Sequence, residues 1–253
     1  MAHSRSPVMH NAALAELGLD WLYARLPLRP ERFEQTVRAL PASGFRGLNV
    51  TVPHKLAAHG LADGHTAAAA AIGAANTLTF VDGRIEADNT DAGGFLDALG
   101  ISPRGLRVLV LGAGGSARAV VWALREAGAA EVSIWNRTAG RAGGLARQMN
   151  VRHAEHPEAA DVLVNCTSVG LDPKTTVPEA LRALELAGHD PPATVVDLVY
   201  GAGPTPLTQW ARGAGARVVE GLEVLASQGA RSLEGWTGRP SPIDLMRRAA
   251  QDR

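Results

Sequence analysis

The sequence is poor in cysteine and carries no excess of charge of either sign. Cys166 is the only cysteine among 253 residues, which excludes an intramolecular disulfide framework and a cysteine-based metal cage. The chain has 25 basic residues (lysine and arginine) and 25 acidic residues (aspartate and glutamate), which gives a formal net charge of zero. This balance favours neither a nucleic acid nor an anionic membrane surface as partner. We therefore expect a cytoplasmic protein with a small-molecule ligand and no metal. Because Cys166 follows an apolar run, we expect a buried structural thiol rather than a nucleophile.

Long hydrophobic runs are absent as well. The alanine run at residues 67–71 is far too short to span a bilayer, and the first residues lack the basic and apolar regions of a signal peptide. Neither a membrane segment nor a targeting segment is therefore expected. An apolar content of 46% with 20% charged residues is typical of a globular protein, and 253 residues suffice for two domains.

The clearest pattern spans residues 107–138 and predicts a strand, a glycine turn, a helix and a second strand. Residues 107–111 form an apolar run of buried-strand length, and the spacing G-x-G-x-x-A follows directly. The first glycine permits a tight turn, the second lets backbone N–H groups approach a pyrophosphate, and the alanine lets the helix pack close to the strand. The pattern predicts a dinucleotide site made by Gly112, Ala113, Gly114, Gly115, Ser116 and Ala117.

The end of the second strand indicates which dinucleotide is bound. A NAD-binding unit places an acid here, which hydrogen-bonds the ribose 2′-hydroxyl, whereas this chain has Asn136, Arg137 and Thr138. A guanidinium pairs with a 2′-phosphate through two charge-assisted hydrogen bonds, and Arg141 adds a second cation one helical turn further on. We therefore predict NADP rather than NAD.

The α/β alternation continues toward residue 220. Thr167, Ser168 and Gly170 form a loop after a predicted strand at residues 161–166, where the cofactor of an open α/β sheet is bound. Further strands are predicted near Val151 and at residues 194–199 and 217–220, and helices at residues 138–149, 205–212, 222–236 and 241–251.

The N-terminal half holds the candidate substrate groups. Ser6 is the predicted N-cap of a helix with Pro7 at its first position, and Ser4 and Ser6 together also make a good carboxylate site. Residues 45–52 are a predicted strand whose Asn49 and Thr51 share one face. Helices at residues 30–40 and 67–75 and a hairpin at residues 76–87 complete this half.

Lys55 follows that strand at the start of a predicted helix. The alternative for such a lysine is a solvated surface position, but the polar strand face beside it favours a ligand crevice. The four polar residues at 88–91 exceed what a helix N-cap requires, so Asp91 is a candidate partner for Lys55. His54 is able to titrate, but we expect no chemical role for it.

The order of these motifs resembles the shikimate dehydrogenase family along nearly the whole chain. The motifs that carry this resemblance are Ser4-x-Ser6-Pro7-x-x-His10-Asn11, Asn49-Val50-Thr51-Val52-Pro53-His54-Lys55, Gly73-Ala74-Ala75-Asn76-Thr77, Asn89-Thr90-Asp91, the glycine turn, Asn136-Arg137-Thr138, Asp197-Leu198-Val199-Tyr200, and Gln228 ahead of Trp236-Thr237-Gly238.

The resemblance implies a two-domain α/β fold and an oxidoreductase that interconverts 3-dehydroshikimate and shikimate with NADP. An N-terminal α/β substrate domain would comprise residues 1–100, with residues 222–253 packing back on it. A Rossmann-type dinucleotide-binding domain would comprise residues 101–221 and include Gly221 among its cofactor-binding residues. The sequence leaves the oligomeric state undetermined, with a homodimer as one possibility.

The resemblance also implies roles for single residues. Lys55 and Asp91 would be the catalytic pair, which suits ketone reduction because a proton-donating cation stabilises the developing alkoxide without a metal. Ser4, Ser6 and Tyr200 would hold the substrate carboxylate. The substrate hydroxyls would be bound by Thr51, Asn76, Asp91 and Gln228.

Two alternatives remain open at this point. One is a quinate/shikimate or related polyol-acid dehydrogenase. The other is a non-catalytic NADP-binding paralogue with an incomplete N-terminal domain, because members of the family usually begin with one more strand and a Gly-x-Pro turn before the serine motif. An upstream start codon would remove that difference.

Overall fold

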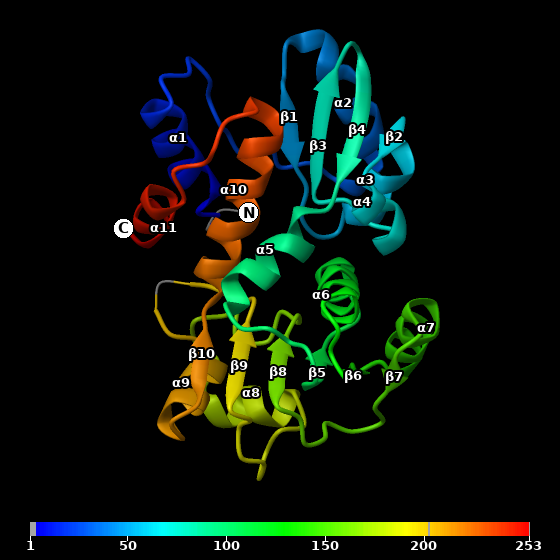
Figure 1. Cartoon of the computed structure of the whole chain (residues 1–253), viewed down its shortest axis with the longest axis vertical. Helices are drawn as coiled ribbons and strands as arrows, with labels where there is room; N and C mark the ends of the chain where they lie inside the picture. Colours follow the sequence, from blue (N-terminus) through cyan, green and yellow to red (C-terminus); the bar gives the residue numbers. More distant parts are fainter. Residues whose placement is uncertain (1–3, 202, 253) are drawn as a thin grey trace. The chain divides into compact units, whose positions relative to one another are not determined.

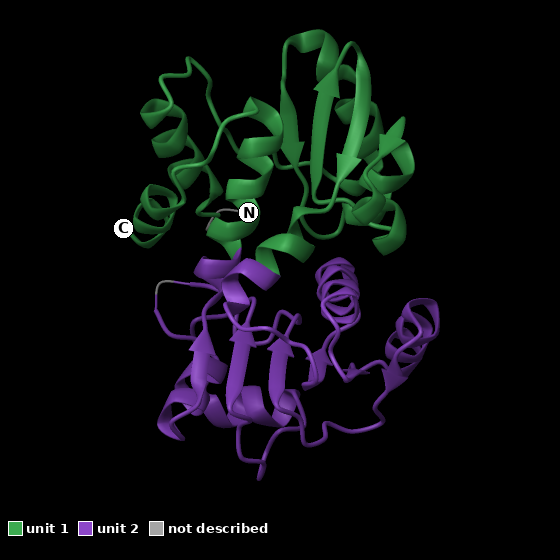
Figure 2. Cartoon of the chain, viewed as in Figure 1, with its two compact units in different colours: residues 1–95, 225–253 green, residues 96–224 purple. Residues whose placement is uncertain are grey.

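The computed structural model describes residues 4–201 and 203–252. The chain forms two compact units, one made of residues 1–95 and 225–253 and the other of residues 96–224 (Figure 2). The two boundaries fall inside helices α5 (Thr90–Leu99) and α10 (Gly221–Thr237). The first unit is therefore built from both ends of the chain, and the second from one continuous segment.

The first unit contains a four-stranded mixed sheet with the strand order β1-β3-β4-β2 (Figure 1). Strands β3 and β4 form the predicted hairpin, with Asp82 and Gly83 at φ angles of 49° and 75° in its turn. Strand β1 pairs antiparallel with β3, and β2 pairs parallel with β4. The strands are β1 (Gly47–Asn49), β2 (Gly64–His65), β3 (Thr77–Val81) and β4 (Arg84–Asp88).

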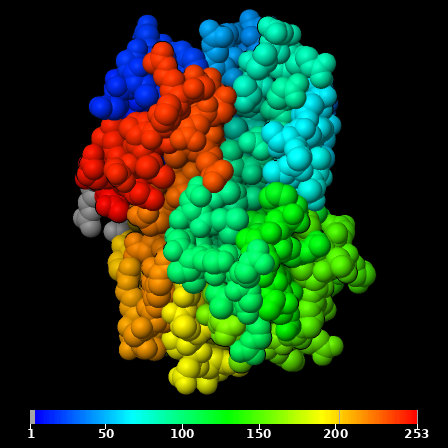
Figure 3. Space-filling view, viewed as in Figure 1, coloured from blue at the N-terminus to red at the C-terminus, as the bar shows by residue number. Residues whose placement is uncertain are grey.

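Helices pack on this sheet, and the first and last helices of the chain pack on each other. Phe33 and Val37 of one helix pack with Leu78 and Phe80 of β3 in the core of the unit. The first helix packs against the last one, as the blue and red segments show in Figure 3. The helices of this unit are α1 (Ser6–Glu16), η1 (Pro30–Arg32), α2 (Phe33–Ala39), η2 (Pro41–Ser43), α3 (Lys55–Leu61), α4 (Ala67–Ile72) and α11 (Ile243–Gln251), with parts of α5 and α10.

The structure corrects two local predictions in this unit. Ser6 is the first residue of α1 and not its N-cap, which is Arg5 without a side-chain capping bond; instead, Ser4 Oγ accepts the Ser6 backbone N–H at 3.3 Å. Strand β1 ends at Asn49, earlier than expected, because the chain turns and His54 N–H donates to Thr51 C=O. The two-residue strand β2 was not predicted, since so short a segment carries no periodicity.

The second unit is a six-stranded parallel sheet with the order β10-β9-β8-β5-β6-β7. The chain starts at β5 in the middle and builds outward in both directions, so the strand order reverses between β5 and β8, where open α/β sheets bind ligands. This topology confirms the predicted α/β fold. The strands are β5 (Arg107–Leu111), β6 (Glu131–Trp135), β7 (Arg152–His153), β8 (Val162–Asn165), β9 (Thr194–Asp197) and β10 (Arg217–Val219).

The helices of this unit are α6 (Gly115–Glu126), α7 (Ala139–Met149), α8 (Val177–Ala183) and α9 (Pro206–Gly213). Helix α8 was not predicted, although Thr176 and Glu179 form a capping box whose T-x-x-E spacing is visible in the sequence. The prediction that the Cys166 thiol is buried is wrong, because β8 ends at Asn165 and Cys166 is half-buried in the following loop.

Candidate active site

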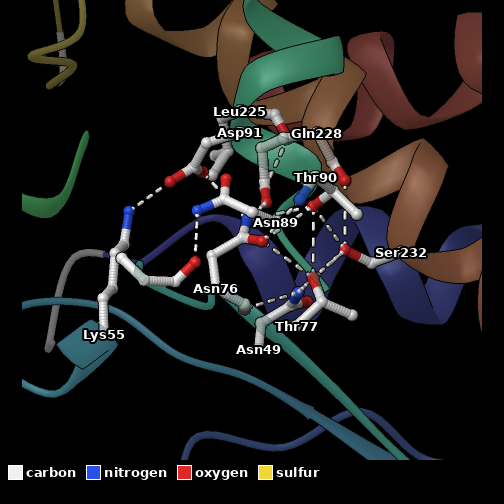
Figure 4. A network of polar contacts seen from close by, with 11 residues as sticks. Asn49, Lys55, Asn76, Thr77, Asn89, Thr90, Asp91, Leu225, Gln228 and Ser232 are labelled. Atoms are coloured by element: carbon white, nitrogen blue, oxygen red, sulfur yellow. Dashed lines mark hydrogen bonds and ion pairs between the residues drawn. The ribbon is translucent and has the colours of Figure 1, made fainter. Parts of the chain in front are cut away.

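Lys55 and Asp91 form an ion pair in the first unit. Lys55 is the first residue of α3, Asp91 lies in the first turn of α5, and Lys55 Nζ donates to Asp91 Oδ2 at 2.5 Å (Figure 4). The two side chains are only 8% and 16% exposed. Lysine occurs twice in this chain, against 23 arginines, and unlike arginine it gives up a proton readily. A buried cation able to donate a proton is therefore held at one carboxylate.

Asn76 fixes the other oxygen of that carboxylate. The Thr90 backbone N–H donates to Asn76 Oδ1 at 2.7 Å, and because a backbone N–H is only a donor, this contact identifies the amide oxygen. The amide nitrogen therefore points the other way, and Nδ2 donates to Asp91 Oδ1 at 2.9 Å and to Gln228 Oε1 at 3.0 Å. Asp91 is thus held at both oxygens.

Gln228 reaches this point from helix α10. Its Nε2 donates to the Leu225 C=O at 2.9 Å, which leaves Oε1 to accept from Asn76. Helix α5 approaches α10 closely here, since a Cβ on Gly94 would lie 2.5 Å from the Gln228 backbone nitrogen. The small residue at position 94 lets Gln228 reach Asn76, a function that was not predicted from the sequence.

The other candidate substrate residues belong to other segments of the chain. Thr51 is exposed and lines an open groove with Leu28 and Val52. Ser4 and Ser6 are half-buried at the start of α1. Tyr200 belongs to the second unit, three residues after β9. The His54 ring stacks on Phe33, and its Nε2 hydrogen-bonds the Leu28 carbonyl at 3.1 Å.

The glycine turn of the second unit has the geometry of a phosphate cradle. Gly112 adopts φ +112°, and a Cβ there would lie 3.1 Å from the Cys166 backbone, so the position requires glycine. Gly114 is the N-cap of α6, and a Cβ there would meet nothing within 4 Å. The space beside Gly114 at the start of α6 therefore has room for an anion. Ala117 is fully buried where α6 packs in the unit.

Asn165 and Asp197 support the loop beside this turn. Asn165 Oδ1 accepts from the Thr167 backbone N–H at 3.0 Å, and its Nδ2 donates to Asp197 Oδ1 at 2.9 Å. The Thr205 hydroxyl donates to the other Asp197 oxygen at 2.5 Å. Burial raises the pKa of Asp197 to about 6, against the opposing effect of these hydrogen bonds. Asn165 was not predicted, because its only signal in the sequence is a polar residue ending an apolar strand.

The candidate groups for a 2′-phosphate follow β6. Asn136 Nδ2 donates to the Thr138 C=O at 3.1 Å, which closes the turn into α7. Arg137 and Arg141 are exposed. Ser116 and Thr167 are half-buried, Ser168 is exposed, and Gly221 is packed so tightly that a Cβ would lie 2.6 Å from the Val199 carbonyl oxygen.

Three family models match the chain. Residues 1–78 match the shikimate dehydrogenase substrate binding domain, residues 98–171 the shikimate / quinate 5-dehydrogenase model, and residues 221–251 the shikimate 5'-dehydrogenase C-terminal domain. The shikimate dehydrogenase (NADP(+)) of Methanopyrus kandleri is 42% identical over 98% of this chain and 90% of its own length. The chain belongs to the shikimate dehydrogenase family.

Solved structures of the family agree with this assignment. The shikimate 5-dehydrogenase of Thermus thermophilus was solved in complex with NADP(H) and shikimate. It matches with a TM-score of 0.87 at 41% identity, and the match covers 99% of this chain and 95% of the Thermus chain. A second relative compared by sequence, the shikimate dehydrogenase (NADP(+)) of Methanothermobacter thermautotrophicus, is 41% identical over 97% of this chain and 91% of its own length. The predicted family is therefore confirmed.

Proposed function

We propose that this chain is an NADP-dependent shikimate dehydrogenase that reversibly reduces 3-dehydroshikimate to shikimate. The observation that carries the proposal is the buried Lys55–Asp91 ion pair, held at both carboxylate oxygens in a chain of this family. The relatives' names supply the reaction class, and the site supplies the proton donor that this reaction needs.

NADP is the cofactor that the second unit fits. The glycine turn leaves an open cradle at the start of α6, since a Cβ on Gly114 would meet nothing within 4 Å. We assign the pyrophosphate to residues 112–117 and the 2′-phosphate to Arg137 and Arg141, which follow β6 without a neighbouring acid in residues 136–141. The proposed cofactor site is completed by residues of three segments, which are Asn136, Thr138, Thr167, Ser168 and Gly221.

Lys55 acts as the general acid in the reducing direction. NADPH, when bound, supplies the hydride to the carbonyl carbon of the substrate. Negative charge then develops on the carbonyl oxygen, and the Lys55 ammonium stabilises it and transfers a proton to it. Lys55 is left as a neutral amine and regains its proton from solvent. In the oxidising direction the amine accepts the hydroxyl proton.

Asp91 and its neighbours place the substrate. Asp91 orients Lys55, and with Asn76, Gln228 and Thr51 it forms the proposed hydroxyl-binding set. Asn76 already links two members of this set, because its Nδ2 donates to Asp91 Oδ1 and to Gln228 Oε1. We assign the substrate carboxylate to Ser4, Ser6 and Tyr200. Ser4 and Ser6 offer hydroxyl groups at the start of α1, which suit an anion, and the family resemblance supports Tyr200.

The proposal is tested by following NADPH absorbance with fixed enzyme. Shikimate with NADP is added first, then quinate with NADP, and then each substrate with NAD. Shikimate-dependent NADPH formation that is lost in Lys55→Ala supports the proposal. Turnover of quinate at a comparable rate would favour the alternative named in one family model, a shikimate / quinate enzyme. Absence of turnover with intact NADP binding would instead show a non-catalytic paralogue.

Compartment and assembly are part of the same proposal. A cytoplasmic location is supported by the single cysteine. A homodimer is the proposed assembly, and light scattering distinguishes it from a monomer of 26.4 kDa.

A further inference from the structure

Three buried hydroxyls form a closed triangle beside the Asn76 amide (Figure 4). Thr77 Oγ1 lies 2.9 Å from Ser232 Oγ and 3.1 Å from Thr90 Oγ1, and Thr90 Oγ1 lies 3.0 Å from Ser232 Oγ. Thr77, Ser232 and Thr90 are 3%, 0% and 5% exposed, in that order. We call this group the hydroxyl triangle. It connects the starts of β3 and α5 with the middle of α10.

The hydroxyl triangle is more than a packing feature of the core. A buried hydroxyl costs free energy unless it is hydrogen-bonded, whereas valine or alanine would fill such positions with no polar group to satisfy. Asn49 adds a further polar group to the triangle, since its Nδ2 donates to Ser232 Oγ at 2.9 Å and to Thr77 Oγ1 at 3.1 Å. Four polar side chains from separate segments thus converge at one buried point.

The hydroxyl triangle contacts the amide that holds Asp91. Thr77 Oγ1 lies 3.1 Å from Asn76 Oδ1, and Thr90 Oγ1 lies 2.9 Å from Asn76 Nδ2. Asn76 Nδ2 carries two hydrogens but has three acceptors within 3.0 Å, on Thr90, Asp91 and Gln228. Ser232 donates its single hydroxyl hydrogen to the Gln228 carbonyl at 3.1 Å, so in its contact with Thr90 it is the Thr90 hydroxyl that donates. Ser232 thereby sets the direction of the Thr90 hydroxyl beside the Asn76 amide.

We propose that Ser232 is a positioning residue for the reaction, which acts through the hydroxyl triangle on Asn76, Asp91 and finally Lys55. This inference rests on the proposed function. The contacts of Ser232 are with Thr77, Thr90, Asn49 and the Gln228 carbonyl, which its hydroxyl reaches at 3.1 Å. Removing its hydroxyl takes away this acceptor and frees the Thr90 hydroxyl to turn toward Asn76 Oδ1, 3.2 Å away, which disturbs the amide that holds Asp91.

The test compares two serines of the same helix. Ser232→Ala removes the hydroxyl from the triangle. Ser227→Ala is the matched control, because Ser227 is also on α10, is 1% exposed, and its Oγ has no hydrogen-bond partner among the described residues. We expect kcat for shikimate oxidation to fall roughly tenfold in Ser232→Ala with KM for NADP unchanged, since small misplacements of reacting groups lower rates by such factors. Ser227→Ala should keep the wild-type kcat.

Substitutions of Thr90 separate the hydroxyl from the rest of the side chain. Thr90→Val keeps the shape and removes the hydroxyl, and should reproduce the loss of kcat. Thr90→Ser keeps the hydroxyl and should restore most of it. If Thr90→Ser is as slow as Thr90→Val, the methyl group matters and the hydroxyl triangle does not position the site.

A spectroscopic measurement tests the positioning independently of turnover. The chain has only two lysines, so selective labelling at lysine Cε gives two NMR signals, and the Lys55 signal is assigned by the loss of the other in Lys174→Ala. We expect the Lys55 signal to shift in Ser232→Ala and not in Ser227→Ala. If the Lys55 signal does not shift in Ser232→Ala, the positioning role is overturned, whether or not the wild type turns over shikimate. If the signal shifts as expected but the wild type is inactive, only the proposed reaction is contradicted.

Discussion

Asp91 Oδ2 lies 2.5 Å from Lys55 Nζ, so one hydrogen bond joins two charges that are both largely removed from water. Breaking such a pair from one side leaves an uncompensated buried charge, which costs more than the pair contributes when intact. The neighbours of Asp91 depend on the same contact, because Asn76 uses one amide hydrogen for the other carboxylate oxygen. Changes at this pair are therefore expected to affect both chemistry and local order.

Removal of the Lys55 amine should abolish most of the turnover. Lys55→Ala is expected to lower kcat by on the order of a hundredfold or more, because a general acid and an alkoxide-stabilising cation are lost together. The affinity for NADP should stay near that of the wild type, as measured by fluorescence titration. Lys174→Ala, at the only other lysine and at an exposed position, is the control. Near-normal turnover in Lys55→Ala would remove Lys55 from the mechanism.

Arg137 should determine the preference between the two nicotinamide cofactors. Arg137→Ala is expected to raise KM for NADPH with little change for NADH, since only NADPH carries the 2′-phosphate that the guanidinium would pair with. Arg147→Ala removes the same charge from the last turn of α7 and should leave both constants unchanged. An unaltered ratio of the two KM values in Arg137→Ala would contradict the assignment of the 2′-phosphate.

The two glycines of the turn should respond differently to an added methyl group. Gly112→Ala places a Cβ 3.1 Å from the Cys166 backbone at φ +112°, and should lower the free energy of unfolding by about 1–3 kcal/mol. Gly114→Ala meets no atom within 4 Å and should leave stability nearly unchanged, but should weaken NADP binding because the methyl group occupies the cradle. Equal effects on stability, measured by urea unfolding, would show that the turn is not shaped as described.

The stability of the second unit should fall as pH rises from about 4 to 6. The pKa of the Asp197 carboxyl is raised to about 6 by burial, from an ordinary value of 3.8, so the folded state binds more protons than the unfolded state in this window. The loss amounts to at most roughly 3 kcal/mol. Urea unfolding of Asp197→Asn should show a weaker pH dependence than the wild type, whereas Asp172→Asn, at an exposed aspartate of the same unit, should follow the wild type.

The first unit should show the opposite dependence. Burial lowers the pKa of His10 to about 4, from 6.5, so the unfolded state binds the extra proton and stability is lost as pH falls from about 6.5 toward 4. His10→Asn keeps a donor for the Ser6 carbonyl, which the His10 Nδ1 contacts at 2.9 Å. Hydrogen exchange of the two units at several pH values should resolve opposite slopes, and a slope unchanged by His10→Asn would contradict this origin.

Much of the second unit could be predicted from the sequence because its signals are local. The G-x-G-x-x-A turn follows a strand whose last four residues are all buried, and the structure has strand, turn, helix and second strand where they were expected. The hairpin at Asp82 and Gly83 is equally local, since both turn residues adopt positive φ angles.

The unpredicted parts depend on contacts between distant segments. Ser232 appears in the sequence only as part of a helix near the end of the chain, and Thr77 and Thr90 are members of motifs in which other residues carry the predicted roles. Only the fold shows that Thr77 and Ser232, 155 positions apart, share a hydrogen bond. Gly94 carries no signal in the sequence for the same reason, because its close approach to Gln228 is set by the packing of two helices.

The first unit is built from both ends of the chain, and this affects when its site is completed during synthesis. Thr90 leaves the ribosome 142 residues before Ser232, its partner in the hydroxyl triangle. At elongation rates of about 5–20 residues per second, the interval is about 7 to 28 s, during which all of residues 96–224 emerge. The nascent chain therefore has a fully synthesised second unit before the residues that order Asn76, Asp91 and Lys55 exist.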